Sequence, residues 1–243
     1  MNNIALLIST YDNSEDLWNL LEKTYLRYWH DISFPIYLTT NHKVFHSQLF
    51  KSLTIGDESS WSDNLIKSLN QIKEEYVLLT FDDLFLTSTV DNQFVEELMS
   101  RAISSGFNYL QFYRSTSKGR KVDDLIFKKL ESTRYKNSTI WSFWRKDILL
   151  ELLHQDEDAW QFERDGNLRS FKYKGFYSTR SNVIPFVNGI VKGIWNPLAK
   201  KKLTRLGFSV SSKRITLDWL STCRYKFRDM QFDFLAYIIH KIY

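Results

Sequence analysis

The stretch YVLLTFDDLFL, residues 76–86, indicates the fold class and raises the first question about function. Its apolar run has the length of a β-strand and predicts a strand that is covered on both faces. The run is interrupted by Asp82 and Asp83, whose charges repel each other and cannot leave water cheaply without a partner. A metal ion, a pair of ribose hydroxyls or a helix N-terminus would each compensate these two carboxylates.

Strands and helices alternate on the N-terminal side of this stretch. Residues 4–9 form another continuous apolar run, and the turn residues after it predict a helix that extends to about Trp29. Further patterns predict strands at 34–41 and 52–57 and a helix over 61–72. Such alternation is typical of an α/β fold with a mostly parallel central sheet.

The alternation continues on the C-terminal side. The patterns there predict a helix at 93–105, a strand at 107–113, a polar and mobile loop at 115–124, and helices at 145–155 and 198–206. Gly207 closes the last of these helices. We therefore expect one α/β domain over residues 1–208 and a C-terminal amphipathic helical extension over 209–243.

The extension carries apolar residues at a spacing of three or four, among basic ones. The apolar set is Ile215, Trp219, Cys223, Phe227, Met230, Phe234, Ile238 and Ile242. A basic amphipathic helix can lie on an anionic membrane surface. The alternative is a helix that packs on the domain, or on a second subunit in a homodimer. The sequence leaves both interpretations open.

Composition limits the class of protein. The 243 residues carry a formal net charge of +5, which favours phosphate-bearing ligands. A lone cysteine excludes an intrachain disulfide framework and fits a reducing compartment. The N-terminus lacks the basic start of a signal peptide, and no apolar run approaches the ~20 residues of a membrane span. We therefore expect a cytoplasmic protein.

Polar clusters follow three of the predicted strands. They are Thr10 to Asp12, then Asp57, then the acid pair Asp82 and Asp83. Open α/β sheets bind ligands at the carboxyl ends of their strands, so we expect these clusters to converge. A hard cation such as Mg²⁺ or Mn²⁺ takes one or two protein carboxylates and completes its shell with water and phosphate. The sequence therefore predicts a binding site for a phosphate-bearing ligand at this edge of the sheet.

Four segments, in order, resemble a bacterial GT-A-type glycosyltransferase of capsule and O-antigen biosynthesis. They are IALLISTYDNSEDL (4–17), WSDNLIKSLNQIKEEYVLLTFDDLFL (61–86), SFWRKDILLELL with AWQFE (142–163) and VNGIVKGIWNP (187–197). The resemblance covers about residues 3–208 and implies a Rossmann-like GT-A domain. It also implies transfer of a sugar from a nucleotide-sugar donor to a growing surface glycan (capsule, O-antigen or lipooligosaccharide), carried on a polyprenyl diphosphate lipid at the inner face of the cytoplasmic membrane.

The resemblance also implies roles for individual residues. The residues expected to hold the base and ribose of the donor are Thr10, Tyr11, Asp12, Asp57 and Asp63. Asp83, with Asp82, would hold a divalent cation and the diphosphate. The sequence itself adds Lys192, because Gly189 and Gly193 beside it provide a flexible backbone that would let this lysine cover the diphosphate. The usual motif of such enzymes is Asp-x-Asp, and Phe81 stands here in place of its first acid.

Glu163 is the candidate catalytic base. Inverting sugar transfer needs a carboxylate that accepts the proton of the acceptor hydroxyl, and nearby aromatic residues can raise the pKa of such a group. Trp160 and Trp141 are the candidates for contact with the acceptor, and the alternative for Trp141 is a position in the core. The alternative for Glu163 is a solvated acid in the acidic run 156–165.

Two other functions share some of these features. A nucleotidyltransferase could use the same sheet and acid pair, but the first strand is not followed by the expected Gly-rich phosphate loop. A basic nucleic-acid-binding module would explain the charge, but it would not explain carboxylates at three strand ends. We therefore expect no nucleic-acid partner.

Overall fold

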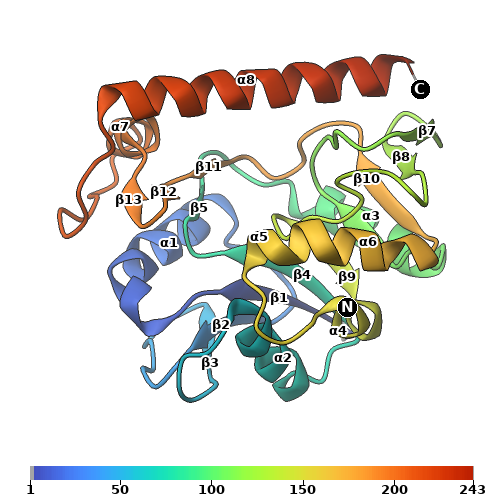
Figure 1. Ribbon diagram of the computed structural model, residues 1–243. Helices are drawn as coiled ribbons and strands as arrows, with labels where there is room; N and C mark the ends of the chain where they lie inside the picture. The colour runs from blue at the N-terminus through green and yellow to red at the C-terminus, as the bar shows by residue number, and fades with distance from the viewer. Residues whose placement is uncertain (1–2, 243) are drawn as a thin grey trace.

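The computed structural model describes residues 3–242 (Figure 1). The helices are α1 (Glu15–Tyr28), α2 (Trp61–Gln71), α3 (Asn92–Ser104), α4 (Lys146–Leu152), α5 (Ala159–Gln161), α6 (Asn167–Arg169), α7 (Pro197–Arg205) and α8 (Trp219–Ile242), with the 3₁₀ turns η1 (Asp12–Ser14) and η3 (Ser170–Lys172) and the π-helical turn η2 (Phe162–Gly166). The strands are β1 (Ile4–Ser9), β2 (Ile36–Thr40), β3 (Phe50–Thr54), β4 (Tyr76–Phe81), β5 (Leu84–Leu86), β6 (Tyr109–Gln111), β7 (Gly119–Lys121), β8 (Ile126–Lys129), β9 (Ser142–Arg145), β10 (Phe176–Thr179), β11 (Phe186–Asn188), β12 (Ile190–Val191) and β13 (Ile194–Trp195).

Within the described residues, nine strands form one sheet in the order β3-β2-β1-β4-β9-β6-β10-β8-β7. The first four of these strands are parallel, and β6 and β10 are parallel to each other. Strand β9 is inserted antiparallel between β4 and β6, and β8 and β7 complete the far edge antiparallel. The predicted α/β class is therefore confirmed.

Helices cover both faces of the sheet. Side chains of a strand alternate between faces, so Ile4, Leu6 and Ile8 of β1 pack in one core cluster while Ala5 and Leu7 pack in the other. Helices α1 and α3 fill the first cluster, and α2 and α4 fill the second. Covering on both faces explains why β1 and β4 are apolar at nearly every position.

The stretch 76–86 is two strands separated by the acid pair. Strand β4 ends at Phe81, Asp82 and Asp83 form the turn, and β5 then pairs antiparallel with β11 in a separate small sheet. Ser9 at the end of β1 is in register with Phe81. Thr10 and Asp82 therefore follow two strands that end side by side.

The region 115–124 was predicted to be a mobile loop, and it contains β7, which pairs with β8 at the edge of the main sheet. The C-terminal helix begins later than its apolar spacing suggests. Before α8, the backbone of Ile215 and Leu217 forms hydrogen bonds with Trp195 of β13, both at 2.9 Å. These residues therefore extend alongside a strand, and the helix starts at Trp219.

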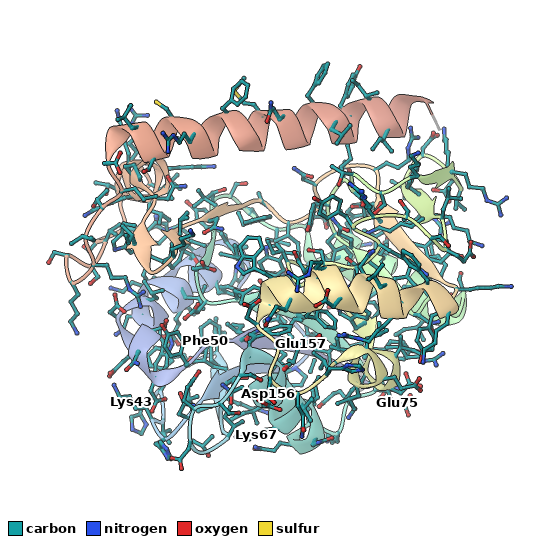
Figure 2. The ribbon with its side chains drawn as sticks, viewed as in Figure 1. Lys43, Phe50, Lys67, Glu75, Asp156 and Glu157 are labelled. Carbon is teal, nitrogen blue, oxygen red and sulfur yellow. The ribbon has the colours of Figure 1, made fainter. Side chains whose placement is uncertain are left out.

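Helix α8 begins near α7 and runs along one side of the molecule (Figure 1). Toward its C-terminal end, the Arg114 guanidinium lies 5.7 Å from the ring centre of Tyr237. Other large side chains of α8 project away from the rest of the chain (Figure 2). No helix among residues 3–242 has the length and apolar character needed to cross a membrane.

Candidate functional site

A pocket of about 590 Å³ opens beside the turn that carries the acid pair. Its walls come from the β4–β5 turn, the segment before β9, the start of α5 with η2, and the β12–β13 hairpin. The lining residues are Phe81, Asp83, Leu84, Thr139, Ile140, Ala159, Trp160, Glu163, Asn188, Ile190, Val191, Lys192 and Asn196. The volume and the mixture of apolar walls with a few charged groups are typical of a small-molecule site.

The two carboxylates of the acid pair face different surroundings. Asp82 is buried, and its Oδ2 accepts a hydrogen bond of 2.5 Å from the Thr10 hydroxyl. The indole of Trp18 donates in turn to Thr10 Oγ1 at 2.9 Å, which fixes the hydroxyl. Asp83 instead lines the pocket. Asp82 is therefore an anchor beneath the site, and Asp83 is the acid that a ligand can reach.

The electrostatic environment of the pair favours a cation at Asp83. Burial raises the pKa of both carboxyls, and the neighbouring Asp82 charge raises the pKa of Asp83 further. No group of three or more His, Cys, Asp and Glu side chains in the described part of the chain could hold a metal on its own. A divalent cation at Asp83 would therefore need ligands from water and from the phosphates of a substrate, as Mg²⁺ commonly does.

Glu163 lies in the π-helical turn η2, and three hydrogen bonds orient its carboxylate. Its Oε1 accepts from Ser138 Oγ at 2.8 Å, from the Thr139 backbone amide at 2.7 Å and from Thr139 Oγ1 at 3.0 Å. The residue also lines the pocket. Single π-helical turns occur frequently at functional sites. A carboxylate held by one oxygen is well placed to present the other to a ligand.

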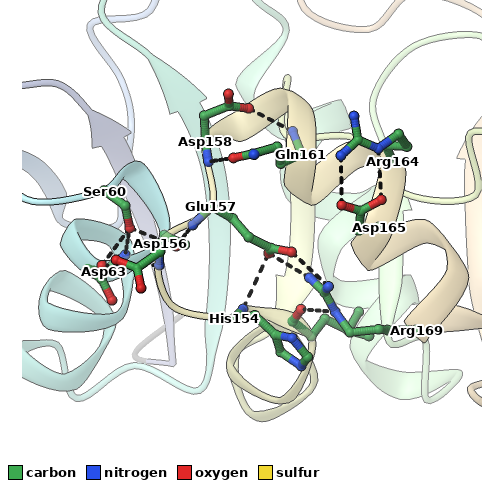
Figure 3. A network of polar contacts seen from close by, with 12 residues as sticks. Ser60, Asp63, His154, Asp156, Glu157, Asp158, Gln161, Arg164, Asp165 and Arg169 are labelled. Carbon is green, nitrogen blue, oxygen red and sulfur yellow. Dashed lines mark hydrogen bonds and ion pairs between the residues drawn. The ribbon is translucent and has the colours of Figure 1, made fainter.

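Other acids around Glu163 have structural partners (Figure 3). Asp165 pairs with Arg164 at 2.8 Å, and Glu157 pairs with Arg169 at 2.6 Å. Asp158 caps α5 by accepting from the Gln161 amide at 2.7 Å. Glu163 is thus the acid of this run that lines the pocket, which argues against a merely solvated acid.

The segment that orients Glu163 is fastened by two buried lysines. Lys129 Nζ donates to Gln111 Oε1 at 2.5 Å and to the carbonyl oxygen of Lys136 at 3.0 Å. Lys136 Nζ donates to the carbonyl oxygens of Ser170 and Tyr173, both at 2.6 Å. Burial lowers the pKa of both lysines. These contacts tie the loop before Ser138 to the sheet and to η3.

Lys192 occupies the tip of the β12–β13 hairpin and lines the pocket. Lys192 and Gly193 have φ values of 50° and 77°, so both lie in the left-handed region. Two consecutive left-handed residues define the tight hairpin turn that matches the twist of the strands. The turn places Lys192 in the lining of the pocket that also contains Asp83.

The two tryptophans proposed to contact an acceptor differ. Trp160 is 74% exposed and lines the pocket. Trp141 is fully buried and packs against Trp29 and Phe186 at ring-centre distances of 6.1 and 6.2 Å. The structure therefore places Trp141 in the core and does not bring it to the pocket, because aromatic packing encloses its ring.

Two of the residues expected to hold the donor support backbone near the end of β1. Thr10 binds Asp82, as described. Asp12 accepts hydrogen bonds from the backbone amides of Asn41, His42 and Lys43 at 2.8 to 3.2 Å, which ties the end of β1 to the end of β2. It also lines a smaller pocket of about 340 Å³, together with Asn13, Glu15, Asp16, Lys43, Lys213 and Arg214.

The remaining donor candidates lie outside the lining of both pockets. Tyr11 is 39% exposed and follows Thr10 in the chain. Asp57 is almost fully exposed and contacts His42 at 2.9 Å. Asp63 accepts from the Ser60 hydroxyl at 2.6 Å in the first turn of α2. Asp57 and Asp63 therefore line neither of these two pockets.

Three residues in or beside the two pockets carry no sequence signal. Ser138 and Thr139 belong to an irregular loop, and Arg214 lies in the segment that the sequence assigns to the extension. Their side chains reach partners 24 to 198 residues away along the chain. Only the folded chain brings them to the site.

Neither a protein-family profile nor a curated protein sequence matches the chain. Solved structures do. The mannosyltransferase PcManGT from Pyrobaculum calidifontis, solved with GDP-Man and Mn²⁺, matches with a TM-score of 0.51 at 10% identity, over 81% of this chain and 59% of that one. S. aureus TarS, solved with UDP-GlcNAc, matches with a TM-score of 0.49 at 13% identity, over 73% and 58%. A UDP-glucose pyrophosphorylase solved with UDP-glucose matches with a TM-score of 0.45 at 6% identity, over 77% and 92%.

At such low identity, the match to the mannosyltransferase is evidence for a shared fold. The chain has the Rossmann-like GT-A fold, with the antiparallel strand β9 inserted beside the central parallel strands. It spans less than two thirds of the length of the mannosyltransferase and TarS chains.

Proposed function

We propose that the protein is a glycosyltransferase that moves a sugar from a nucleotide-sugar donor to an acceptor hydroxyl, with inversion at the anomeric carbon. The observation that carries the proposal is the presence of Glu163 and Asp83 in the lining of one pocket of a GT-A fold. One is a carboxylate oriented by three hydrogen bonds, and the other is a desolvated acid suited to a cation.

In the proposed reaction, Glu163 accepts the proton of the acceptor hydroxyl while the hydroxyl oxygen bonds to C1 of the donor sugar. The bond between C1 and the diphosphate oxygen breaks, and the nucleoside diphosphate leaves. Asp83 and water would hold a divalent cation, Mn²⁺ or Mg²⁺, which would supply positive charge opposite the leaving diphosphate. Lys192 lines the same pocket from the β12–β13 hairpin and would add a second positive charge for the diphosphate.

The acceptor in this proposal is a growing bacterial surface glycan, of the capsule, O-antigen or lipooligosaccharide type, attached to a polyprenyl diphosphate lipid. Support comes from the sequence resemblance and from Trp160, whose exposed ring at the pocket can stack on a sugar face. Such an acceptor would place the protein in the cytoplasm at the inner face of the membrane.

The test is a thermal-shift screen of the protein against nucleotide-sugars with uridine, guanosine, thymidine and cytidine bases, each with and without Mn²⁺. A ligand that binds the folded state at 100 times its Kd stabilises it by ~2.7 kcal/mol, which raises the melting temperature measurably. We expect one nucleotide-sugar to do so, and more strongly with Mn²⁺. The proposal fails if no nucleotide-sugar shifts the melting temperature and the protein is instead retained on polyanions.

We also propose that α8 contacts the membrane that carries the acceptor. Phe227, Met230 and Phe234 follow the spacing of one helix face and are 62%, 60% and 65% exposed. Lys213 and Arg224, near the start of the helix, are exposed as well. An exposed apolar face near basic residues is typical of a helix that lies in the interface of an anionic bilayer.

Replacement of Phe227, Met230 and Phe234 together by serine should abolish co-sedimentation with anionic vesicles, because the apolar face supplies the buried area. Wild-type binding should weaken with salt, since each basic residue near the surface contributes roughly 1 kcal/mol. Val44→Ser, at another exposed apolar position, is the control. A wild-type protein that ignores vesicles and is dimeric by light scattering, with a monomeric triple variant, would show that the face binds a second subunit.

A further inference from the structure

Arg214 joins the segment before α8 to the site. Its side chain is 14% exposed, and its Nε and Nη2 donate to the Asp16 carboxylate of α1 at 2.9 and 2.8 Å. Both partners of this ion pair are largely buried. Removing two charges from water is costly, and such pairs often contribute little net stability. A contribution to net stability therefore does not by itself explain why this ion pair is buried here.

The same guanidinium reaches two other parts of the chain. Its Nη2 lies 3.3 Å from both the Asn13 carbonyl oxygen and the Ser14 hydroxyl, at the start of α1. Its Nη1 donates to the carbonyl oxygen of Gly193 at 3.5 Å. Gly193 follows Lys192 in the β12–β13 turn. A planar group with five donors can hold several partners in one fixed arrangement.

Through the short segment between β1 and α1, Arg214 is also connected to the acid pair. Ser14 of this segment lies 3.3 Å from the Arg214 Nη2, and Thr10 of the same segment donates to Asp82 at 2.5 Å. The positive charge of Arg214 acts on both Asp82 and Asp83. A nearby cation favours the charged form of a carboxylate and so reduces the cost of two adjacent acids.

The backbone on both sides of Arg214 is fixed to the same hairpin. Ile215 and Leu217 form hydrogen bonds with the backbone of Trp195, the last residue of β13. Trp195 is fully buried and stacks on Phe85 of β5 at a ring-centre distance of 5.7 Å. The segment around Arg214 therefore has one defined path across the hairpin.

We propose that Arg214 is a positioning residue of the donor site, which holds the Lys192 hairpin and the start of α1 against the acid pair. This inference rests on the proposed function, because it assigns Arg214 to the binding of the donor diphosphate. Lys192 and Asp83 lie on separate loops. A diphosphate that contacts both binds most tightly when the protein already holds the two residues at the right separation. The role would be lost with the segment 209–218, even though residues 1–208 contain the rest of the site.

The test compares the wild-type protein with Arg214→Met and Arg214→Lys. Hydrogen exchange without any ligand should accelerate in residues 188–196 and 10–16 of Arg214→Met and stay unchanged in α2 and α4. The Kd for the preferred nucleotide-sugar with Mn²⁺ should rise roughly 10–100-fold, as for other residues that orient the ligands of a metal. Arg214→Lys keeps the positive charge but lacks the planar guanidinium group. Its donor affinity should therefore lie between those of Arg214→Met and the wild-type protein. Arg120→Met, at an exposed arginine of β7, is the control and should change neither measurement.

The outcomes separate this inference from the proposed function. A wild-type protein that binds no nucleotide-sugar contradicts the proposed function, while faster local exchange in Arg214→Met still supports the positioning role. The inference is overturned if the wild-type protein binds a donor and Arg214→Met binds it with the same Kd and shows the same hydrogen-exchange rates. If Arg214→Met does not fold, the same comparison with Arg214→Lys decides, and wild-type values there overturn it.

Discussion

Glu163→Gln should lower the turnover of sugar transfer ~10²–10⁴-fold, because the amide cannot accept the proton of the acceptor hydroxyl. Glutamine has nearly the same shape, and its carbonyl oxygen can still accept the hydrogen bonds from Ser138 and Thr139. The Kd for the donor should therefore stay near the wild-type value. Single-turnover kinetics, with donor binding measured by calorimetry, would separate the two effects.

The matched control for Glu163→Gln is Asp165→Asn. Asp165 lies in the same π-helical turn but pairs with Arg164 near the surface. Its replacement should leave turnover within about twofold, since surface substitutions of this kind change stability by only roughly 0.5 kcal/mol or less. Near-normal turnover in Glu163→Gln would refute the assignment of the base.

Asp83→Asn should abolish Mn²⁺-dependent donor binding and leave the protein folded. The amide is close in shape to the carboxyl group but lacks the negative charge that a hard cation requires. The substitution also relieves the repulsion between Asp82 and Asp83, so the melting temperature of the free protein should stay the same or rise. Calorimetric titration with the preferred nucleotide-sugar, with and without Mn²⁺, measures the loss.

Asp57→Asn is the control for Asp83→Asn. Asp57 was expected to hold the donor, yet its side chain is almost fully exposed and outside both pockets. Donor affinity should be unchanged in this variant. Undiminished Mn²⁺-dependent binding in Asp83→Asn would remove the metal role, and weakened binding in Asp57→Asn would show that the donor extends over the β2–β3 edge.

The sequence predicts the central part of the fold well, for a physical reason. Strands β1 and β4 are covered on both faces, so they appear as continuous apolar runs, and the helices beside them keep a clear apolar spacing. The register that aligns Ser9 with Phe81 then brings Thr10 next to Asp82. The convergence of these two strand ends is therefore predictable from the order of the elements.

Other features depend on contacts that sequence patterns do not encode. Trp141 and Trp160 are both tryptophans near the site, but packing against Trp29 and Phe186 buries the first while the second is exposed. Asp57 follows a strand as expected, but β3 lies at the edge of the sheet, away from the acid pair. Strand order and side-chain packing decided these positions, and neither is visible in local periodicity.

The left-handed conformation of Lys192 has a consequence for engineering. A residue other than glycine costs about 1 kcal/mol or more in this region of backbone space. A campaign that ranks variants by melting temperature alone would therefore favour glycine or asparagine at position 192. Either substitution would raise the melting temperature but remove a positive charge from the pocket. Variants at this turn should therefore be selected for melting temperature and donor affinity together.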